Sequence, residues 1–250
     1  MRFRDKVAIV TAGTAGIGKE VAHRFVEEGG SVVINGRNAE RASTAAREID
    51  PTGKRVAVLE GDIDTPTTAD AVVTTALDRF GRLDVLFSNV GILVPKSFLS
   101  LPEIERESVL DGILCRKFSA VQAAAAAMKF AGNGGVIVQI GSMWALEAVQ
   151  AKPSAAYSAA DAGIHARITN LAIELAPHGI RLNAVVERLG YGKILTPEHV
   201  NALLMALNGM RPLGRFGKPA DAAEILLYFA SDQTKDVTGM VLPVDGTFRG

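Results

Sequence analysis

Residues Val7 to Gly18 read V-A-I-V-T-A-G-T-A-G-I-G, and this stretch decides the fold. Its first four residues are apolar, which is typical of a buried parallel strand. The glycine-rich turn after them leads into a helix with apolar residues at helical spacing, Ile17, Val21 and Phe25. Such a turn directs unpaired backbone N–H groups and the positive end of the helix dipole at one point, which suits an anion, above all a nucleotide pyrophosphate. A purely structural turn is the alternative, because the generic pattern alone is weak.

Strands and helices alternate along the rest of the chain. The expected strands are 7–10, 31–35, 55–59, 85–88, 135–140, 180–186 and 240–244, and the expected helices are 17–28, 36–49, 67–80, 102–130, 155–176, 195–207 and 220–230. This alternation predicts an α/β fold, a doubly wound parallel sheet with helices on both faces and ligands at the carboxyl ends of the strands. We expect a single domain over residues 1–250, with the irregular segment at about 187–210 as a candidate lid.

Composition limits the function classes. The chain has 27 Lys and Arg against 27 Asp and Glu, so there is no electrostatic case for a nucleic-acid or membrane partner. The single cysteine, Cys115, excludes an internal disulfide and fits a reducing compartment, and the four histidines are scattered, so no metal site is expected. The charged N-terminus predicts no signal peptide, and the Ala-rich segment 120–128 is too short to span a membrane. A cytoplasmic protein is expected.

The residues at the ends of the second and third strands indicate which nucleotide cofactor the chain would bind. The second reads Asn35-Gly36-Arg37-Asn38, with no carboxylate. In a nucleotide-binding fold an acidic residue here favours NAD, whereas an arginine can pair with the 2′-phosphate of NADP. We therefore expect NADP(H) rather than NAD(H), with a solvated loop arginine as the alternative. Asp62, at the tip of the third strand, could accept a hydrogen bond from an adenine amino group or could cap the next helix.

The ordered motifs of the chain resemble the short-chain dehydrogenase/reductase family essentially from end to end. The resemblance rests on the glycine turn, Asp62, Ser88-Asn89-Val90-Gly91, Ser142 and Tyr157, which occur in the family's order. It implies a Rossmann-type fold, a nicotinamide cofactor and the interconversion of carbonyls and alcohols. Carried over by position, the cofactor-binding residues are Gly13, Thr14, Gly16, Ile17, Gly18, Arg37, Asn38, Asp62, Ile63, Asn89 and Gly91. Ala12 replaces the family's first glycine, a mild departure because alanine adds only a methyl group.

The reactive end departs further from the family pattern. Members use a Tyr as general acid/base, a Lys four residues on that lowers the tyrosine pKa and holds the nicotinamide ribose, a Ser that orients the substrate and an Asn in a proton relay. Ser142 and Tyr157 match this pattern, and the catalytic residues expected here are Ser142, Tyr157 and Asp161. However, Asp161 stands where the Lys belongs, and Ile113 stands at the relay Asn. Glu187-Arg188 replaces the family's Pro-Gly turn, so binding of the nicotinamide half could be weak or lost. A substitute cation could come from Lys117, Lys152, Arg188 or Lys193, although surface charges are the simpler interpretation.

The charge of Asp161 has a predictable effect. Positions i and i+4 share a helix face, so its carboxylate is expected near Tyr157. At about 5 Å and an effective dielectric near 20, two unit charges interact by roughly 3 kcal/mol, which should raise the pKa of Tyr157 above its usual ~10. Tyr157 would then be a neutral hydrogen-bond donor and a poor base, and Asp161→Lys would raise reductase activity. His165, one turn further on, could form a general-base row with both residues, or it is simply packed or solvated.

Two functions fit this pattern. One is an NADP(H)-dependent oxidoreductase with an altered proton relay. Its substrate is expected to be an apolar small molecule, because Met143, Trp144 and residues 195–210 would line the pocket by family position, although core packing explains these apolar residues equally well. The other is a non-redox relative: a nucleotide- or ligand-binding regulatory or partner subunit, or a non-redox acid/base catalyst. Family members commonly form tetramers through two long helices. The Ala-rich face 120–127 would allow such packing, so a homotetramer is expected, with a hetero-oligomer with an active relative as the alternative.

Overall fold

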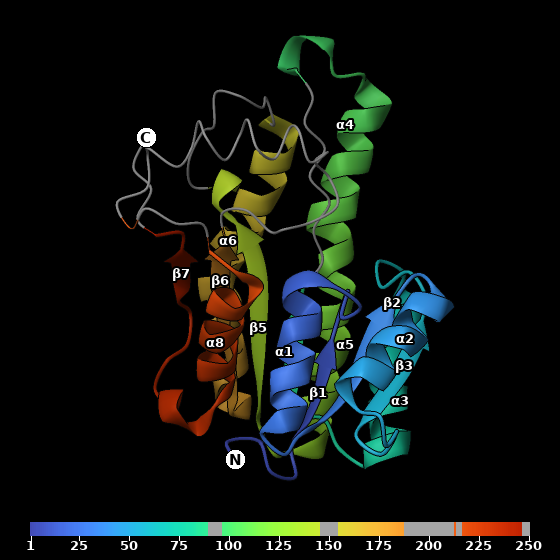
Figure 1. Ribbon diagram of the computed structural model, residues 1–250. Coiled ribbons are helices and arrows are strands. Elements are labelled where there is room, and N and C mark those ends of the chain that lie inside the picture. The colour runs from blue at the N-terminus through green and yellow to red at the C-terminus, as the bar shows by residue number, and fades with distance from the viewer. Residues whose placement is uncertain (90–96, 146–154, 188–212, 214–216, 247–250) are drawn as a thin grey trace.

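The computed structural model describes residues 1–89, 97–145, 155–187, 213 and 217–246. Seven strands form one parallel sheet in the order β3-β2-β1-β4-β5-β6-β7 (Figure 1). The strands are β1 (Val7–Val10), β2 (Ser31–Gly36), β3 (Val56–Glu60), β4 (Val85–Ser88), β5 (Gly135–Ser142), β6 (Ile180–Glu187) and β7 (Val241–Val244). The order reverses between β1 and β4, and such a switch point is where ligands bind in open α/β sheets.

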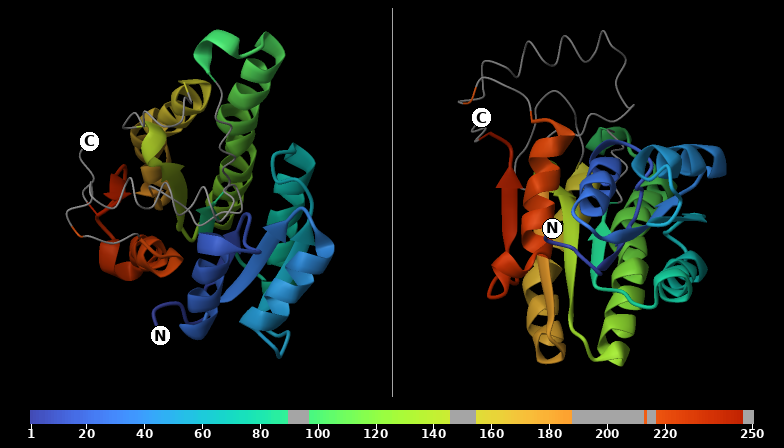
Figure 2. Two further views of the ribbon diagram at one scale, coloured as in Figure 1. Left: turned by 45° about the horizontal axis from the view of Figure 1, so that its top comes forward. Right: turned by 60° about the horizontal axis from the view of Figure 1, so that its bottom comes forward.

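Helices cover both faces of the sheet. The longer ones are α1 (Gly16–Glu27), α2 (Ala39–Ile49), α3 (Pro66–Phe80), α4 (Glu103–Leu110), α5 (Arg116–Ala131), α6 (Ala155–Leu175) and α8 (Pro219–Ala230). Short helical turns are η1 (Phe98–Ser100), η2 (Asp111–Cys115), η3 (Met143–Ala145), η4 (Ala176–His178) and η5 (Asp232–Thr234). Helices α1, α2 and α8 pack on one face and α3, α5 and α6 on the other, as Figures 1 and 2 show from three directions. The predicted doubly wound α/β sheet is therefore confirmed.

The central strand β1 shows why an apolar run folds this way. Ala8 and Val10 point into the core beneath α1 and α8, whereas Val7 and Ile9 point into the core beneath α3 and α5. Successive side chains of a strand face opposite sides, so a strand covered on both sides must be apolar at every position. The unbroken apolar run therefore marks the middle of the sheet.

The expected element ends are close to the observed ones, with one interruption. The helix expected at 102–130 consists of α4, the π-helical turn η2 and α5. The expected helix at 195–207 lies outside the described residues, as does the candidate lid beyond Glu187. Within the ranges that the structure describes, no helix is both long and apolar enough to cross a bilayer.

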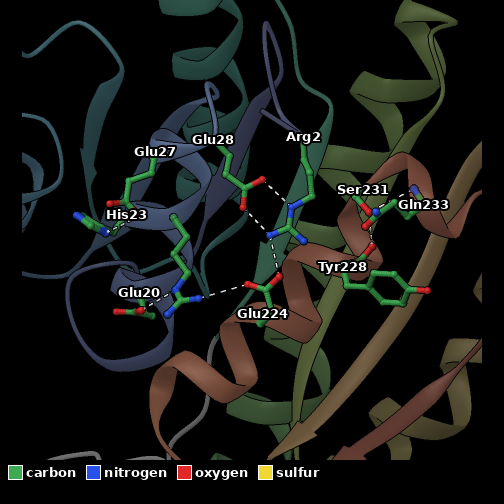
Figure 3. A network of polar contacts seen from close by, with 10 residues as sticks. Arg2, Glu20, His23, Glu27, Glu28, Glu224, Tyr228, Ser231 and Gln233 are labelled. Carbon is green, nitrogen blue, oxygen red and sulfur yellow. Dashed lines mark hydrogen bonds and ion pairs between the residues drawn. The ribbon is translucent and has the colours of Figure 1, made fainter.

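A network of ion pairs joins the N-terminus to two helices (Figure 3). Arg2 donates through Nε and Nη2 to the carboxylate of Glu28, at 2.6 and 2.5 Å, and its Nη2 lies 2.9 Å from Glu224. Arg24 on α1 donates to Glu20 at 2.7 Å and to Glu224 at 3.3 Å. Because Glu224 belongs to α8, this network connects segments from both ends of the sequence.

Candidate functional site

The turn between β1 and α1 is tightly packed beneath and open above. A Cβ at Gly18 would lie 2.5 Å from Asn89 Nδ2 and 2.6 Å from the carbonyl oxygen of Ala12, so only glycine fits there. Gly16 has φ +56°, and nothing lies within 4 Å of the place where its Cβ would be. The turn therefore leaves room for a ligand to approach the backbone closely.

The start of α1 suits an anion. Its N-cap residue, Ala15, makes no side-chain hydrogen bond to the first turn, and that turn contains no acidic residue. Ile17 is buried in the core, so only its backbone could face a ligand. Backbone N–H groups at a helix start that no side chain caps can bind phosphate. The residues present therefore fit the pyrophosphate of a dinucleotide.

The tip of β2 is held close to this turn and to β3. The Gly13 N–H donates to the Asn35 carbonyl at 3.0 Å, and a Cβ at Gly36 would lie 2.5 Å from Thr14 Cγ2. The buried Asn35 amide donates to the carbonyl oxygens of Leu59, at 3.2 Å, and Gly61, at 3.1 Å. Sequence reasoning gave Asn35 no role. The sequence nevertheless contained a signal for it, because Asn35 is a polar residue at the end of an otherwise apolar strand.

The two residues after β2 have different surroundings. Arg37 is exposed and makes no hydrogen bond or ion pair with the described part of the chain. Asn38 is the N-cap of α2, where its side chain accepts from the Arg41 N–H at 2.9 Å. Arg37 is thus available to a ligand, whereas Asn38 already has a structural task.

The tip of β3 leads to α3 through exposed Asp62. The side chain of Asp62 accepts from the Asp64 N–H at 3.2 Å, while Thr65 is the N-cap of α3 and accepts from the Thr68 N–H at 3.3 Å. Thr65 therefore takes the helix-cap position that was the alternative for Asp62. Ile63 is buried in the core, so its side chain is structural.

The ends of β1 and β4 are tied together at the switch point. The hydroxyl of buried Thr11 accepts from the Asn89 N–H at 2.8 Å, and Asn89 Nδ2 lies 3.4 Å from the Ala12 carbonyl oxygen, to which it donates. Asn89 therefore shapes the glycine turn from beneath. Gly91, expected beside it, lies outside the described residues.

The reactive end centres on Tyr157, near the start of α6. Its side chain is buried in an apolar cluster that includes Val109, Ile113 and Ile164. Ile113 belongs to the π-helical turn η2 and is itself buried. The residue at the position assigned by resemblance to the relay Asn therefore lies in the same apolar cluster as Tyr157, and its hydrocarbon side chain cannot relay a proton.

The ionisation of Tyr157 is strongly disfavoured. Burial, which penalises the charged phenolate, raises the pKa of Tyr157 to about 12, and the carboxylates of Asp161 and Glu187 act in the same direction. A hydrogen bond with the Ser142 side chain acts against them. The expected rise above the usual value is confirmed, but burial rather than Asp161 is its main cause.

Asp161 lies deep in the molecule. Its side chain is fully buried, and Oδ2 accepts from the Ser142 backbone N–H at 2.7 Å. The same oxygen lies 3.7 Å from His165 Nε2, and His165 is also buried, as the packed alternative required. A Cβ at Gly141 would lie 2.2 Å from that Nε2 atom, so His165 packs directly under β5.

Several expected site residues cannot be placed. Residues Lys152, Arg188 and Lys193 lie outside the described residues, as do the side chains of Lys117 and Trp144. Met143 is buried. In the ranges with described positions, no group of three or more His, Cys, Asp or Glu residues could hold a metal ion.

A cavity of about 510 Å³ lies at the opposite edge of the sheet, at the amino ends of β4, β5 and β6. Of the four basic side chains that line it, Arg2, Lys6 and Arg181 already make ion pairs or hydrogen bonds. Lys6 Nζ lies 3.4 Å from Asp84, and Arg181 donates to the carbonyl oxygens of Phe229, Ser231 and Val237. The candidate site is therefore at the carboxyl edge, where the glycine turn and Tyr157 lie.

Comparison with known proteins identifies relatives that match this chain over nearly its whole length. A family model described as enoyl-(acyl carrier protein) reductase matches residues 11–248. L-rhamnose 1-dehydrogenase (NAD(P)(+)) of a Sphingomonas species is 35% identical over 250 residues, 98% of this chain and 96% of that protein. The 3α-hydroxysteroid dehydrogenase of Mediterraneibacter gnavus is 34% identical over 255 residues, 100% of this chain and 99% of that protein.

Solved structures give the same result. A 7α-hydroxysteroid dehydrogenase complexed with NADH and 7-oxo glycochenodeoxycholic acid superposes with a TM-score of 0.90 at 29% identity, covering 99% of this chain and 95% of that one. A short-chain type dehydrogenase/reductase from Mycobacterium marinum gives 0.88 at 28% identity, covering 98% and 95%. The similarity therefore extends over nearly the whole chain and is not confined to the glycine turn.

Proposed function

Because the chain belongs to the short-chain dehydrogenase/reductase family, an oxidoreductase family, we propose that it is an NADP(H)-dependent carbonyl reductase. The observation that carries the proposal is the buried Tyr157, which remains a neutral phenol beside the Ser142 side chain. A bound nicotinamide cofactor would supply the hydride. The chain itself would hold the substrate oxygen and deliver a proton to it.

The proton chemistry favours the reducing direction. With a pKa of about 12, the Tyr157 phenol stays protonated at neutral pH and can donate its proton to a carbonyl oxygen that gains negative charge. The Ser142 hydroxyl, which is hydrogen-bonded to Tyr157, would help to orient that oxygen. Alcohol oxidation would need the phenolate, which burial and two carboxylates oppose.

Measuring cofactor consumption with a panel of ketones and aldehydes tests this function. We expect turnover with NADPH, and a loss of about 10²-fold or more in Tyr157→Phe, the size typical for removal of a general acid. A matched control is Tyr228→Phe, because Tyr228 lies on α8, away from the candidate site. Equal losses in both variants would show that Tyr157 has no special role.

The preference for NADP(H) rests on Arg37. This side chain lies exposed beyond β2, in a tip of residues 35–38 that contains no carboxylate, and its guanidinium could pair with a 2′-phosphate. In fluorescence titrations we expect NADPH to bind at least about tenfold more tightly than NADH, an ordinary size for one charge-assisted contact. Arg37→Ala should remove that difference, whereas Arg41→Ala, an exposed arginine on α2, should keep it. Equal losses for both nucleotides in Arg37→Ala would contradict the assignment.

A non-redox role is the second candidate. It is favoured by the apolar Ile113 in the cluster around Tyr157 and by Asp161 at the position of the family's Lys. Tight NADPH binding without turnover of any carbonyl would support this role, either as a regulatory or partner subunit or as a non-redox acid/base catalyst. Turnover that depends on Tyr157 would exclude it.

The substrate and the assembly also belong to the proposal. We propose an apolar small molecule as substrate, and the panel should contain steroid ketones beside sugar-derived carbonyls, since relatives are named for both classes.

We propose a homotetramer through α5 and α6. Because Ala120, Ala124 and Ala125 pack into the core of their own chain, the contact would use outward positions such as Gln122 and Ala126. Light scattering after gel filtration tests the assembly, and a hetero-oligomer with an active relative is the alternative. A cytoplasmic location remains a prediction.

A further inference from the structure

We infer that Asp161 is a positioning residue whose buried carboxylate fixes the end of β5 and thereby holds the Ser142 hydroxyl against Tyr157. The inference rests on the proposed roles of Ser142 and Tyr157. It assigns to Asp161 a task different from that of the lysine whose place it takes.

The first step is the contact between carboxylate and backbone. Asp161 Oδ2 accepts from the Ser142 N–H at 2.7 Å, and the aspartate side chain is fully buried. Ser142 is the last residue of β5, where the strand pairs with Glu187 at the end of β6. A charge-assisted hydrogen bond in a buried place is among the stronger single contacts, so it can fix the strand end.

The second step is the packing that keeps the carboxylate in place. His165 lies one helical turn beyond Asp161, with its Nε2 atom 3.7 Å from Oδ2. Gly141 approaches the same ring so closely that any larger residue at position 141 would displace it. The carboxylate is thus enclosed between the end of β5 and the His165 ring.

The third step links this anchor to Tyr157. Ser142 is held by Asp161 through its backbone and by Tyr157 through its side chain. The two holding residues are one turn apart on α6, so a single helix sets the position of the serine. Around Tyr157, α6 contributes the carboxylate of Asp161 and β6 that of Glu187, while α4 and η2 contribute the apolar Val109 and Ile113.

Three substitutions separate anchoring from charge. Asp161→Asn keeps an oxygen that can accept from the Ser142 N–H but removes the charge, Asp161→Ala removes both, and Ser142→Ala removes only the hydroxyl. For carbonyl reduction we expect Asp161→Asn to stay within about threefold of the wild type and Asp161→Ala to lose about tenfold or more. In the Ser142→Ala background, Asp161→Ala should cost no more than about a further twofold, because residues that act through one another are not additive. Equal losses in Asp161→Asn and Asp161→Ala, or additive losses with Ser142→Ala, would overturn the inference.

A second measurement needs no turnover, so it remains decisive even if the reductase proposal fails. The ionisation of Tyr157 is followed by the ultraviolet absorbance of tyrosinate, with Tyr157→Phe subtracted to remove the other tyrosines. Asp161→Asn and Asp161→Ala both remove the negative charge, but only the Asn variant should keep Ser142 in place to hydrogen-bond the phenolate. We expect Tyr157 to ionise at a lower pH in Asp161→Asn than in Asp161→Ala, with circular dichroism confirming that both are folded. Identical titrations would show that Asp161 acts through its charge alone.

Discussion

Ala12 has a backbone conformation that glycine adopts far more easily. Its φ is +47°, in the left-handed region, and its carbonyl oxygen is one of the two groups that leave no room for a side chain at Gly18. An L-residue with a Cβ costs roughly 1–2 kcal/mol in this region. The alanine that replaces the family's glycine therefore introduces backbone strain, besides the extra methyl group.

Ala12→Gly is accordingly expected to stabilise the protein. Relief of strain is partly offset by the larger conformational freedom of glycine in the unfolded chain, so we expect the free energy of unfolding to rise by about 0.5–1 kcal/mol. Chemical denaturation measures this change. Ala15→Gly is the control, because Ala15 has an extended backbone with φ −158° and should gain nothing. A destabilised Ala12→Gly variant would show that the strain is absent.

The pH dependence of catalysis should differ between the two directions. With a pKa of Tyr157 near 12, only about one molecule in 10⁴ carries the phenolate at pH 8. Alcohol oxidation, which needs the phenolate as base, should therefore rise about tenfold per pH unit above neutrality, while carbonyl reduction, which needs the phenol, should stay level between about pH 6 and 9. Initial rates with saturating cofactor measure both profiles. An oxidation rate that levels off near pH 8 would contradict the neutral tyrosine.

At the scale of single elements, the sequence was sufficient where a pattern has one structural solution. The apolar run of β1 specifies a strand buried on both faces, and β4 begins and ends where expected. The π-helical turn η2 could not be located from the sequence. Such a turn shifts the spacing of apolar residues by only one position, and the helix is too short for that shift to be visible. The spacing of Tyr157 and Asp161 correctly placed both on one helix and predicted the direction of the tyrosine pKa.

The contact of Asp161 with β5 could not be predicted in the same way. Helical spacing fixes a face, but the strand that meets that face is set by the packing of the whole sheet. A lysine at position 161 would lack the carboxylate oxygen that now accepts from the Ser142 N–H. The increase in reductase activity expected for Asp161→Lys remains a prediction: the substitution would remove a carboxylate that raises the pKa of Tyr157, but it would also remove the acceptor that holds Ser142.

The ion pairs that join the N-terminus to α1 and α8 should contribute to stability in a pH-dependent way. Hydrogen bonds from Arg2 hold the pKa of Glu28 below its ordinary value. A lowered carboxylate pKa contributes stability above the unfolded value, about 4.3 for Glu, and this contribution is lost as the pH falls through the lower folded value. We expect Arg2→Met to cost about 1 kcal/mol at pH 7 and less below about pH 4. Denaturation at both pH values tests this, with exposed Arg4→Met as the control. If the loss of stability in Arg2→Met is the same at both pH values, it comes from lost packing and not from the ion pair.

For the whole molecule, the sheet topology brings the parts of the nucleotide site to one edge. The start of α1, the tip of β2 and the end of β4 come from separate parts of the sequence, yet Asn35, Thr11 and Asn89 tie them together by hydrogen bonds. A ligand that contacts all three parts binds only the folded chain. Its binding free energy should therefore appear as stability of the entire fold.

Thermal unfolding in the presence of cofactor measures this coupling. NADPH at about 100 times its dissociation constant should add about 2.7 kcal/mol, which for a chain of this size raises the melting temperature by roughly 5–10 °C. NADH at the same concentration should give a smaller rise.

Arg37 is exposed and has no partner among the described residues, so Arg37→Ala should leave the melting temperature of the free protein unchanged. In that variant the NADPH rise should fall to that of NADH, while Arg41→Ala should behave like the wild type. Equal rises in the wild type would refute the NADP preference, and no rise with either nucleotide would refute the binding site.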